Sequence, residues 1–312
     1  MSTGLPRRID IVVPTYNGVH LLRQHLPTLL DCAPAASVTV VDDGSTDGSV
    51  EVLRGDFSFV NVVAREGNGG FSVAANEGIR ATLSELVLLL NNDVEVSPGF
   101  LDSIVPMFED ESVFAVSPRI VLPTKGNLDE GAKTGLWHHG MLYSDQRQDV
   151  AEVTPILFAT GCAAVYRRSM LEELGGFDEA YSPFYREDAD LGYRAWKRGW
   201  KSLYQPASMV YHQHAVSISK LKRSLTDRIK ARNGLFFIWR NIEDERLLLQ
   251  HRLWLPAVLL KRAAHGDSAS LLGWKSAFAR RREAVLAREL DSEHRVLSDR
   301  EIFETVGVRV PK

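Results

Sequence analysis

Residues Leu86–Glu95 read Leu-Val-Leu-Leu-Leu-Asn-Asn-Asp-Val-Glu. Five consecutive apolar residues predict a strand that is buried on both faces, as in a parallel sheet. The strand ends in Asn91–Asp93, at the edge where open α/β sheets bind their ligands. A carboxylate at this position suits a divalent cation, because Mg²⁺ and Mn²⁺ prefer oxygen ligands. An ordinary strand-to-helix turn explains the same residues, since Ser97-Pro98 is typical of a helix start.

The residues before this stretch repeat a pattern of apolar strand, polar turn and helix. The predicted strands are Ile9–Pro14, Val38–Val41 and Val60–Ala64, and the predicted helices are 21–30, Val50–Arg54 and Ser72–Leu83. Right-handed crossovers between parallel strands would place the polar turns on one edge of the sheet. Residues such as Gly, Asn and Asp occur in any tight connection of this kind. The adjacent carboxylates of Asp42 and Asp43 are harder to explain as a turn, because they repel each other and require compensation.

The second half of the chain is less regular. Residues Pro123–Val153 lack periodicity, which is typical of a functional loop or of an insertion that covers a site. His138-His139 within it suggests a metal, but adjacent histidines point in different directions, and a surface loop is the preferred interpretation. A strand is predicted over Pro155–Arg168, followed by a helix over Ser169–Leu174.

An acidic cluster then opens a helix that ends at Gly199. Glu187, Asp188 and Asp190 place three acids in four residues, which fits either a functional site or simple pairing with the helix dipole. The last predicted strand, Lys201–Gln213, contains His212 near its end. A single histidine at a strand end is more often structural than a ligand.

Composition predicts a soluble, cytoplasmic protein. The chain has 312 residues, of which 45% are apolar, and no apolar run approaches the ~18 residues that a membrane-spanning helix needs. The two cysteines, Cys32 and Cys162, form no CxxC pair and are expected to be buried thiols.

Charge is distributed unevenly along the chain. Residues 1–219 carry 17 Lys and Arg against 28 Asp and Glu, whereas residues 220–312 carry 20 against 12. The sequence argues against nucleic acid as a partner, because residues 1–219 are acidic and contain no nucleic-acid-binding motif. Basic and apolar residues alternate over the predicted helices 246–262 and 275–288, which fits an interfacial helix pair on anionic lipid. Packing of these helices on the rest of the chain explains them equally well.

Seven motifs in order resemble those of the inverting GT-A glycosyltransferases, a large family that includes rhamnosyltransferases and polysaccharide synthases. The motifs are Pro14–Asn17, Asp42–Ser45, Asn68–Gly70, Asn91–Asp93, Gly175–Asp178, Glu187-Asp188 and His212. The resemblance covers about residues 8–240. It implies an α/β fold with a mixed, mainly parallel, Rossmann-like sheet flanked by helices. It divides a catalytic domain, 1–240, into a nucleotide-binding half, 8–122, and an acceptor-binding and catalytic half, 123–240. A basic helical extension, 241–312, follows.

The resemblance also assigns roles to residues. The nucleotide-binding set is Pro14, Thr15, Tyr16, Asn17, Asp43, Asn68, Gly70 and Asn92. Asp43 is expected to accept the N3–H of a uracil or thymine ring. Asp93 and His212 are the expected ligands of Mg²⁺ or Mn²⁺, although the family's Asp-x-Asp motif begins here with Asn91, which makes the site less anionic. Asp188 is the expected base, with Glu187 and Asp190 beside it.

Sugar transfer needs a cation to neutralise the leaving diphosphate, a base to deprotonate the acceptor and a nucleotide pocket. A single carboxylate base opposite the leaving group gives inversion by direct displacement. The resemblance therefore implies transfer from a UDP- or dTDP-sugar, dTDP-rhamnose among them. The acceptor would be a hydroxyl of a glycan or polyprenyl-diphosphate-linked saccharide in cell-surface polysaccharide synthesis. Peripheral contact with the inner face of the plasma membrane and a homodimer are further expectations.

Two other functions compete with this one. The first is a non-catalytic GT-A-like binding protein, which would be expected to have lost at least one of Asp43, Asp93, Asp188 and His212. The second is a sugar-1-phosphate nucleotidyltransferase, whose glycine-rich signature with a lysine near the N-terminus is missing.

Overall fold

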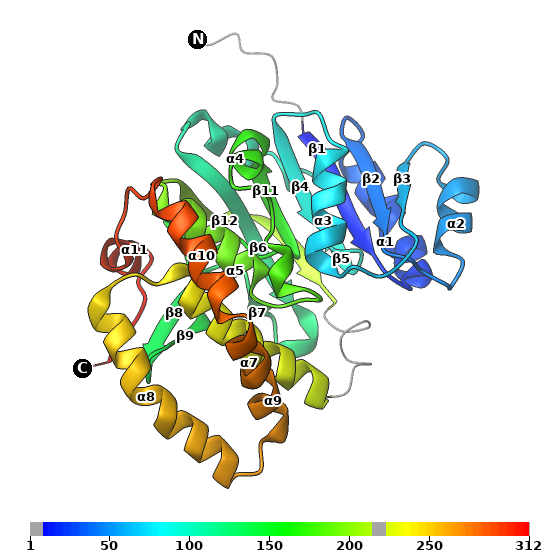
Figure 1. Cartoon of the computed structure of the whole chain (residues 1–312). Helices are drawn as coiled ribbons and strands as arrows, with labels where there is room; N and C mark the ends of the chain where they lie inside the picture. Colours follow the sequence, from blue (N-terminus) through cyan, green and yellow to red (C-terminus); the bar gives the residue numbers. More distant parts are fainter. Residues whose placement is uncertain (1–8, 214–222, 312) are drawn as a thin grey trace.

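A single large sheet runs through the molecule (Figure 1). The computed structural model describes residues 9–213 and 223–311. The sheet has ten strands in the order β10-β12-β6-β11-β4-β1-β2-β3, with β5 paired to β12 and β7 paired to β6. The strands are β1 Ile9–Thr15, β2 Ser37–Asp42, β3 Asn61–Ala64, β4 Leu86–Leu90, β5 Val94–Val96, β6 Val113–Leu122, β7 Leu128–Asp129, β10 Thr154–Pro155, β11 Ala163–Arg167 and β12 Lys201–His212. Strands β1 to β4 are parallel to one another, as are β6 and β12, whereas β11 runs antiparallel between β4 and β6. The mixed, mainly parallel sheet expected from the sequence is confirmed.

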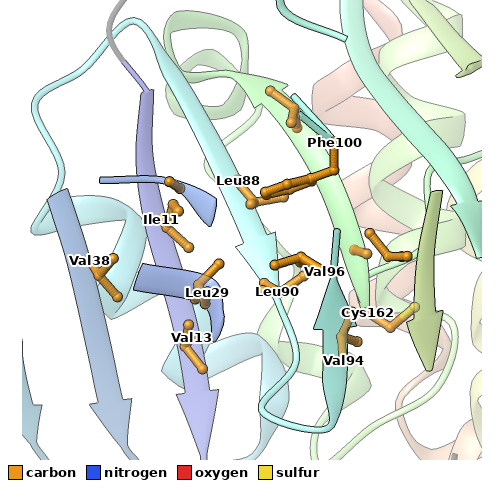
Figure 2. Close-up of a cluster of buried hydrophobic side chains, with 14 of the residues drawn as sticks. Ile11, Val13, Leu29, Val38, Leu88, Leu90, Val94, Val96, Phe100 and Cys162 are labelled. Atoms are coloured by element: carbon orange, nitrogen blue, oxygen red, sulfur yellow. The ribbon is translucent and has the colours of Figure 1, made fainter. Parts of the chain in front are cut away.

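Helices cover both faces of the parallel part. They are α1 Val19–Cys32, α2 Ser49–Asp56 and α3 Phe71–Arg80. Successive strand residues point to opposite faces, so β1 sends Ile11 and Val13 towards α1 and Val12 towards α3. Figure 2 shows Ile11, Val13, Leu88 and Leu90 gathered with Leu29 of α1 in one buried cluster. The predicted central strand is therefore buried on both faces.

The carboxyl ends of β1, β2 and β3 lie at the same level of the sheet. Thr15 at the end of β1 pairs with Asp42 at the end of β2, and Asp42 pairs with Ala64 at the end of β3. The turns that follow these strands therefore share one edge of the sheet, as the sequence predicts.

The region after β4 corrects two expectations. Ser97-Pro98 starts no α-helix: turns lead to a short 3₁₀ helix, η1, at Val105–Glu109. The predicted strand 155–168 is divided into β10 and β11, because residues 156–162 leave the sheet while remaining buried. An apolar run does not distinguish a strand from other buried backbone.

Residues 123–153 are not irregular throughout. They contain η2 (Pro123–Lys125), β7 and a hairpin of β8 Lys133–His138 and β9 Met141–Gln146. The turn residues of the hairpin are His139 and Gly140, with φ of 49° and 70°. Positive φ at both central residues is the geometry of a two-residue hairpin turn. Asn-Gly or Asp-Gly would have signalled such a turn, but His-Gly does not.

The remaining helices, apart from α4, which packs on β11, build a second core beside the sheet. They are α4 Arg168–Glu173, η3 Glu179–Tyr181, α5 Glu187–Lys197, α7 Arg223–Asn241, α8 Glu245–Ala264, α9 Ser268–Ala279, α10 Arg281–Ser292 and α11 Asp299–Thr305. One buried cluster joins Trp137 of β8, Tyr193 of α5, Phe237 of α7, Trp274 of α9 and Ile302 of α11. The C-terminal helices therefore share a core with the hairpin and with α5. The predicted helix 275–288 is two helices that meet at Arg280.

The two thiols are free. Cys162 is buried in the cluster of Figure 2, while Cys32 is partly buried against it. None of the helices in residues 9–213 and 223–311 combines the length and the apolar composition that crossing a bilayer requires.

Candidate active site

Three of the predicted motifs meet at the edge formed by the ends of β1, β2 and β4. Asn17, with φ 48°, donates its backbone N–H to Ser45 Oγ at 2.8 Å. Its side-chain oxygen accepts the Thr46 N–H at 2.8 Å. Asn92 Nδ2 donates to Thr15 Oγ1 at 2.7 Å, which ties the turn after β4 to the end of β1. These bonds leave Tyr16 with 44% of its surface exposed at the end of β1.

The adjacent carboxylates of Asp42 and Asp43 have the compensation that their repulsion requires. Asp43 Oδ1 and Oδ2 accept the N–H groups of Gly69 at 2.9 Å and Gly70 at 2.8 Å. Arg65 Nε lies 2.9 Å from Asp43 Oδ1, and Asp42 Oδ1 accepts the Ser45 N–H. Asp43 thus holds the glycine-rich turn in place, and contact with a pyrimidine ring would add to the hydrogen bonds it already makes. Asn68 is exposed in the same turn.

Asp93 and His212 lie together because β5 pairs with the end of β12. His212 Nε2 is 3.2 Å from Asp93 Oδ1, and His212 Nδ1 is 3.7 Å from Glu130 Oε2. Burial opposes the charged imidazolium, but Cys162, Asp93 and Glu130 outweigh it and raise the pKa of His212 to about 12.

Asp93 and His212 supply some, but not all, of the ligands that a divalent cation needs. A carboxylate and a neutral imidazole are both suitable ligands. Among the residues that the structure describes, no group of three or more His, Cys, Asp and Glu side chains is arranged to hold a metal ion. Asp93 and His212 would therefore supply two protein ligands and need further oxygens from outside the chain. His212 would also have to lose its proton when the cation binds.

Glu187 and Asp188 occupy the first turn of α5. Glu187 is only 8% exposed, and burial, with the nearby charge of Asp188, raises its pKa to about 8. Asp188 is partly exposed. Burial also raises the pKa of Asp188, while hydrogen bonding from Ala189 and the charge of Lys133 oppose the shift. Of the two residues, Asp188 is the more exposed.

Asp190 lies deeper in the protein than Glu187 and Asp188. It is completely buried and accepts hydrogen bonds from Tyr181 Oη at 3.0 Å, Arg194 Nε at 2.7 Å and Asn241 Nδ2 at 2.8 Å. Burial alone would raise its pKa, but Arg194 and Arg240 lower it. Asp190 anchors α5 to η3 and α7, which supports a structural role, and its catalytic role stays a prediction.

The glycine-rich turn contacts the loop that precedes Glu187. Phe71 N–H donates to the Pro183 oxygen at 2.9 Å. Gly70 has φ 89°, and a Cβ at this position would lie 2.7 Å from the Pro183 backbone, so only glycine permits the approach. The turn that binds Asp43 therefore abuts the segment that carries Asp188.

Several residues of the site were not predicted. Arg65 compensates Asp43, and Glu130 and Lys133 lie near His212 and Asp188. Arg65 stands one residue after the end of β3, a position that suggests the polar edge. No signal in the sequence identifies Glu130 or Lys133 as site residues, because the fold around the β8–β9 hairpin brings them to the site. His138 and His139 stack on each other, and His139 stacks on Trp254 at 4.1 Å between ring centroids.

Comparison of the sequence with known proteins identifies a family and several relatives. Residues 10–175 match the model of the family described as Glycosyl transferase family 2. One relative is the N-acetylglucosaminyl-diphospho-decaprenol L-rhamnosyltransferase of Mycobacterium tuberculosis, 28% identical over 242 residues, which are 68% of this chain and 78% of that protein. Another is the pre-mycofactocin glycosyltransferase of the same species, 29% identical over 68% of this chain and 44% of its own length. The chondroitin synthase of Escherichia coli is 25% identical over 72% of this chain and 37% of that protein.

Solved structures share the fold. GalNAc-T7 with UDP, GalNAc and Mn²⁺ superposes with a TM-score of 0.67 at 16% identity, over 96% of this chain and 56% of that one. Residues 1–349 of Staphylococcus aureus TarS, in complex with UDP-GlcNAc, superpose with a TM-score of 0.59 at 15% identity, over 92% and 89%. The family model covers more than half of the chain, and solved structures share the fold over most of its length: the chain belongs to glycosyl transferase family 2 and is a GT-A glycosyltransferase.

Proposed function

We propose that the protein transfers a sugar, with inversion, from a UDP- or dTDP-sugar to a hydroxyl of a lipid-linked saccharide. The observation that carries this proposal is the contact between the turn bound by Asp43 and the loop that ends at Glu187 and Asp188. It sets the proposed nucleotide-binding residues against the proposed base. The name of the mycobacterial rhamnosyltransferase supports rhamnose as the transferred sugar and a polyprenyl-diphosphate-linked saccharide as the acceptor; dTDP-rhamnose as donor and a role in cell-surface polysaccharide synthesis are part of the proposal.

Asp188 acts as the base in this proposal. Its carboxylate takes the proton of the acceptor hydroxyl, the acceptor oxygen attacks the anomeric carbon, and the bond to the diphosphate breaks with its electrons on the leaving oxygen. Glu187, with a pKa of about 8, keeps its own proton near neutral pH. Two neighbouring carboxyl groups with different protonation states suit a site that needs one base.

Asp93 and His212 would hold Mg²⁺ or Mn²⁺. When bound, the ion would neutralise charge on the leaving diphosphate. On the nucleotide side, Asp43 would accept the N3–H of the pyrimidine, and the exposed ring of Tyr16 offers a surface on which the base can stack. Pro14, Thr15, Asn17, Asn68, Gly70 and Asn92 would complete the pocket.

A lipid-linked acceptor requires contact with a membrane, and the surface of α8 supports one. Four large apolar side chains of α8 are exposed: Leu249 by 54%, Leu253 by 69%, Trp254 by 44% and Leu260 by 73%. The charged residues Arg252 and Lys261 are exposed on the same helix. Apolar side chains beside basic ones fit the boundary of an anionic bilayer.

The helices α9 and α10 are less suited to that role than the sequence indicated. Arg280 donates to the Ala180 oxygen and to Glu283, and Arg281 lies over the ring of Trp239. These contacts support packing for Arg280 and Arg281, although Leu272, Phe278, Leu286 and Leu290 of α9 and α10 are exposed. We propose α8 as the membrane surface. Leu253→Asp should release the protein from anionic liposomes at low salt, where attraction is strongest. Two results would count against membrane contact by α8. One is that Leu253→Asp binds liposomes as well as the parent does, and the other is that the parent is a dimer that Leu253→Asp dissociates.

A thermal-shift panel tests the donor. Ligands that bind the native state raise its melting temperature by mass action. We expect UDP, dTDP and their sugars, with Mn²⁺, to raise the melting temperature, and GDP to leave it unchanged. Equal stabilisation by GDP would contradict the role of Asp43. Nucleotide binding without transfer to any lipid-linked or soluble glycan acceptor would favour the non-catalytic alternative.

A further inference from the structure

The loop of residues 181–186 brings Glu187 and Asp188 to the site in an unfavourable conformation. Tyr185 and Arg186 have φ of 75° and 79°. This left-handed region is rarely adopted by bulky side chains. Two such residues in succession persist only where surrounding contacts hold them, and such strain collects at functional sites.

Every main-chain oxygen of residues 181–185 accepts a hydrogen bond from a residue outside the loop. Asn233 Nδ2, on α7, reaches three of them. These are the oxygens of Tyr181 at 2.8 Å, Phe184 at 3.0 Å and Tyr185 at 2.7 Å. Arg232 donates to the oxygens of Tyr181 and Ser182, and Phe71 donates to that of Pro183. The conformation of the loop thus depends on one side-chain amide more than on any other group.

Asn233 is suited to this task by its surroundings. It is completely buried, and its Oδ1 accepts Arg232 Nε at 2.7 Å, which orients the amide with its nitrogen towards the loop. An amide nitrogen has two hydrogens, so at least one of them is shared between two carbonyl oxygens. The entire donor capacity of Asn233 is therefore used on the segment that carries Glu187 and Asp188.

We propose that Asn233 is a positioning residue for sugar transfer, which holds the left-handed turn at Tyr185 and Arg186 and thereby aims Asp188 at the acceptor. The inference rests on the proposed role of Asp188 as base. Without the amide, the oxygens of Phe184 and Tyr185 lose their partner and the turn can relax towards negative φ. The first turn of α5 then shifts. A displacement of about 1 Å in a catalytic group costs as much as about 10²-fold in rate.

Asn233→Ala tests the inference with four readouts. Turnover of the nucleotide sugar selected by the thermal-shift panel should fall by about 10- to 100-fold. The thermal shift produced by UDP or dTDP should stay within error of the parent, because the nucleotide turns are not attached to Asn233. Hydrogen exchange of the backbone amides of residues 184–190 should become faster. The acid limb of the rate profile should also move to lower pH as Asp188, the proposed base, becomes hydrated, because burial raises its pKa; loss of stability alone does not produce this change.

Tyr193→Phe is the matched control. It removes a buried hydrogen bond of 2.6 Å to Asp299 from the same helix, α5, without touching residues 181–186. It should lower stability and keep turnover. If Asn233→Ala does not fold, Asn233→Ser retains one donor and should show the same changes at smaller amplitude.

The outcomes separate this inference from the proposed function. Parental turnover in a folded Asn233→Ala, with Asp188→Asn inactive, would overturn the positioning role and leave the base intact. Parental turnover in Asp188→Asn would overturn the base itself. Loss of turnover in both variants, with nucleotide binding retained, supports the inference.

Discussion

Asp188→Asn removes a base while preserving the volume and most of the contacts of the side chain. Asp188 Oδ1 accepts the Ala189 N–H at 2.7 Å, and Oδ2 lies 3.4 Å from the Gly161 N–H. The oxygen of an asparagine can keep the shorter bond. General-base catalysis contributes about 10²- to 10⁴-fold, which corresponds to about 3–5 kcal/mol of barrier. We therefore expect turnover to fall by at least about 10²-fold while nucleotide binding is unchanged.

Glu187→Gln is the discriminating comparison. With a pKa of about 8, Glu187 is already mostly protonated at pH 7. Replacing a neutral carboxyl by a neutral amide changes little, so this variant should retain most of its turnover at pH 7. The rate profile of this variant should also fit a single titrating carboxyl group, because in the parent the ionisation of Glu187 and that of Asp188 affect each other.

The assay measures release of UDP or dTDP from the selected donor in the presence of acceptor, with nucleotide binding followed by thermal shift. Both variants are compared with the parent across pH 5–9. The reasoning is refuted if Glu187→Gln loses the greater part of turnover and Asp188→Asn keeps it, since the base is then Glu187.

Three further predictions follow from the site. Asp93→Ala should abolish transfer or strongly raise the Mn²⁺ requirement, because an anionic ligand is lost; full activity of the parent in EDTA would remove the metal from the mechanism. The folded-state pKa of Glu187, about 8, lies above its ordinary value of 4.5, so its contribution to stability is complete below about pH 4 and is lost as pH rises through 8. The stability of Glu187→Gln relative to the parent, from urea unfolding, should therefore increase between those values, and a flat difference would contradict the burial argument. Asp190→Ala should lower the free energy of unfolding by about 3–5 kcal/mol, because the buried Arg194 loses its carboxylate partner; parental stability with lost activity would support the catalytic role of Asp190.

The nucleotide half could be predicted from the sequence because its signals are local. Apolar runs such as Leu86–Leu90 identify the strands, and the crossover rule puts their polar ends on one edge. The repulsion between Asp42 and Asp43 indicated that a compensating group was needed. It did not indicate Arg65, because that pairing depends on the register of β2 and β3.

The second half was harder to predict for two physical reasons. Residues 156–162 are apolar because they are buried, and burial imposes no strand geometry on them. The roles of Asp188 and Asp190 depend on which side of one helical turn faces α7. The spacing of Asp190 and Arg194 permits an ion pair along the helix, but only the position of Asn241 on α7 shows that this side is the buried one.

The contact between Gly70 and Pro183 constrains how this enzyme can be recombined with its relatives. In the division expected from the sequence, Gly70 belongs to the nucleotide half and Pro183 to the acceptor half, and no side chain fits between them. A chimera that joins the nucleotide half of one glycosyltransferase to the acceptor half of another would bring together two surfaces that were not shaped for each other. Donor specificity can therefore be exchanged only if the segment around Pro183 is taken from the same parent as the turn around Gly70.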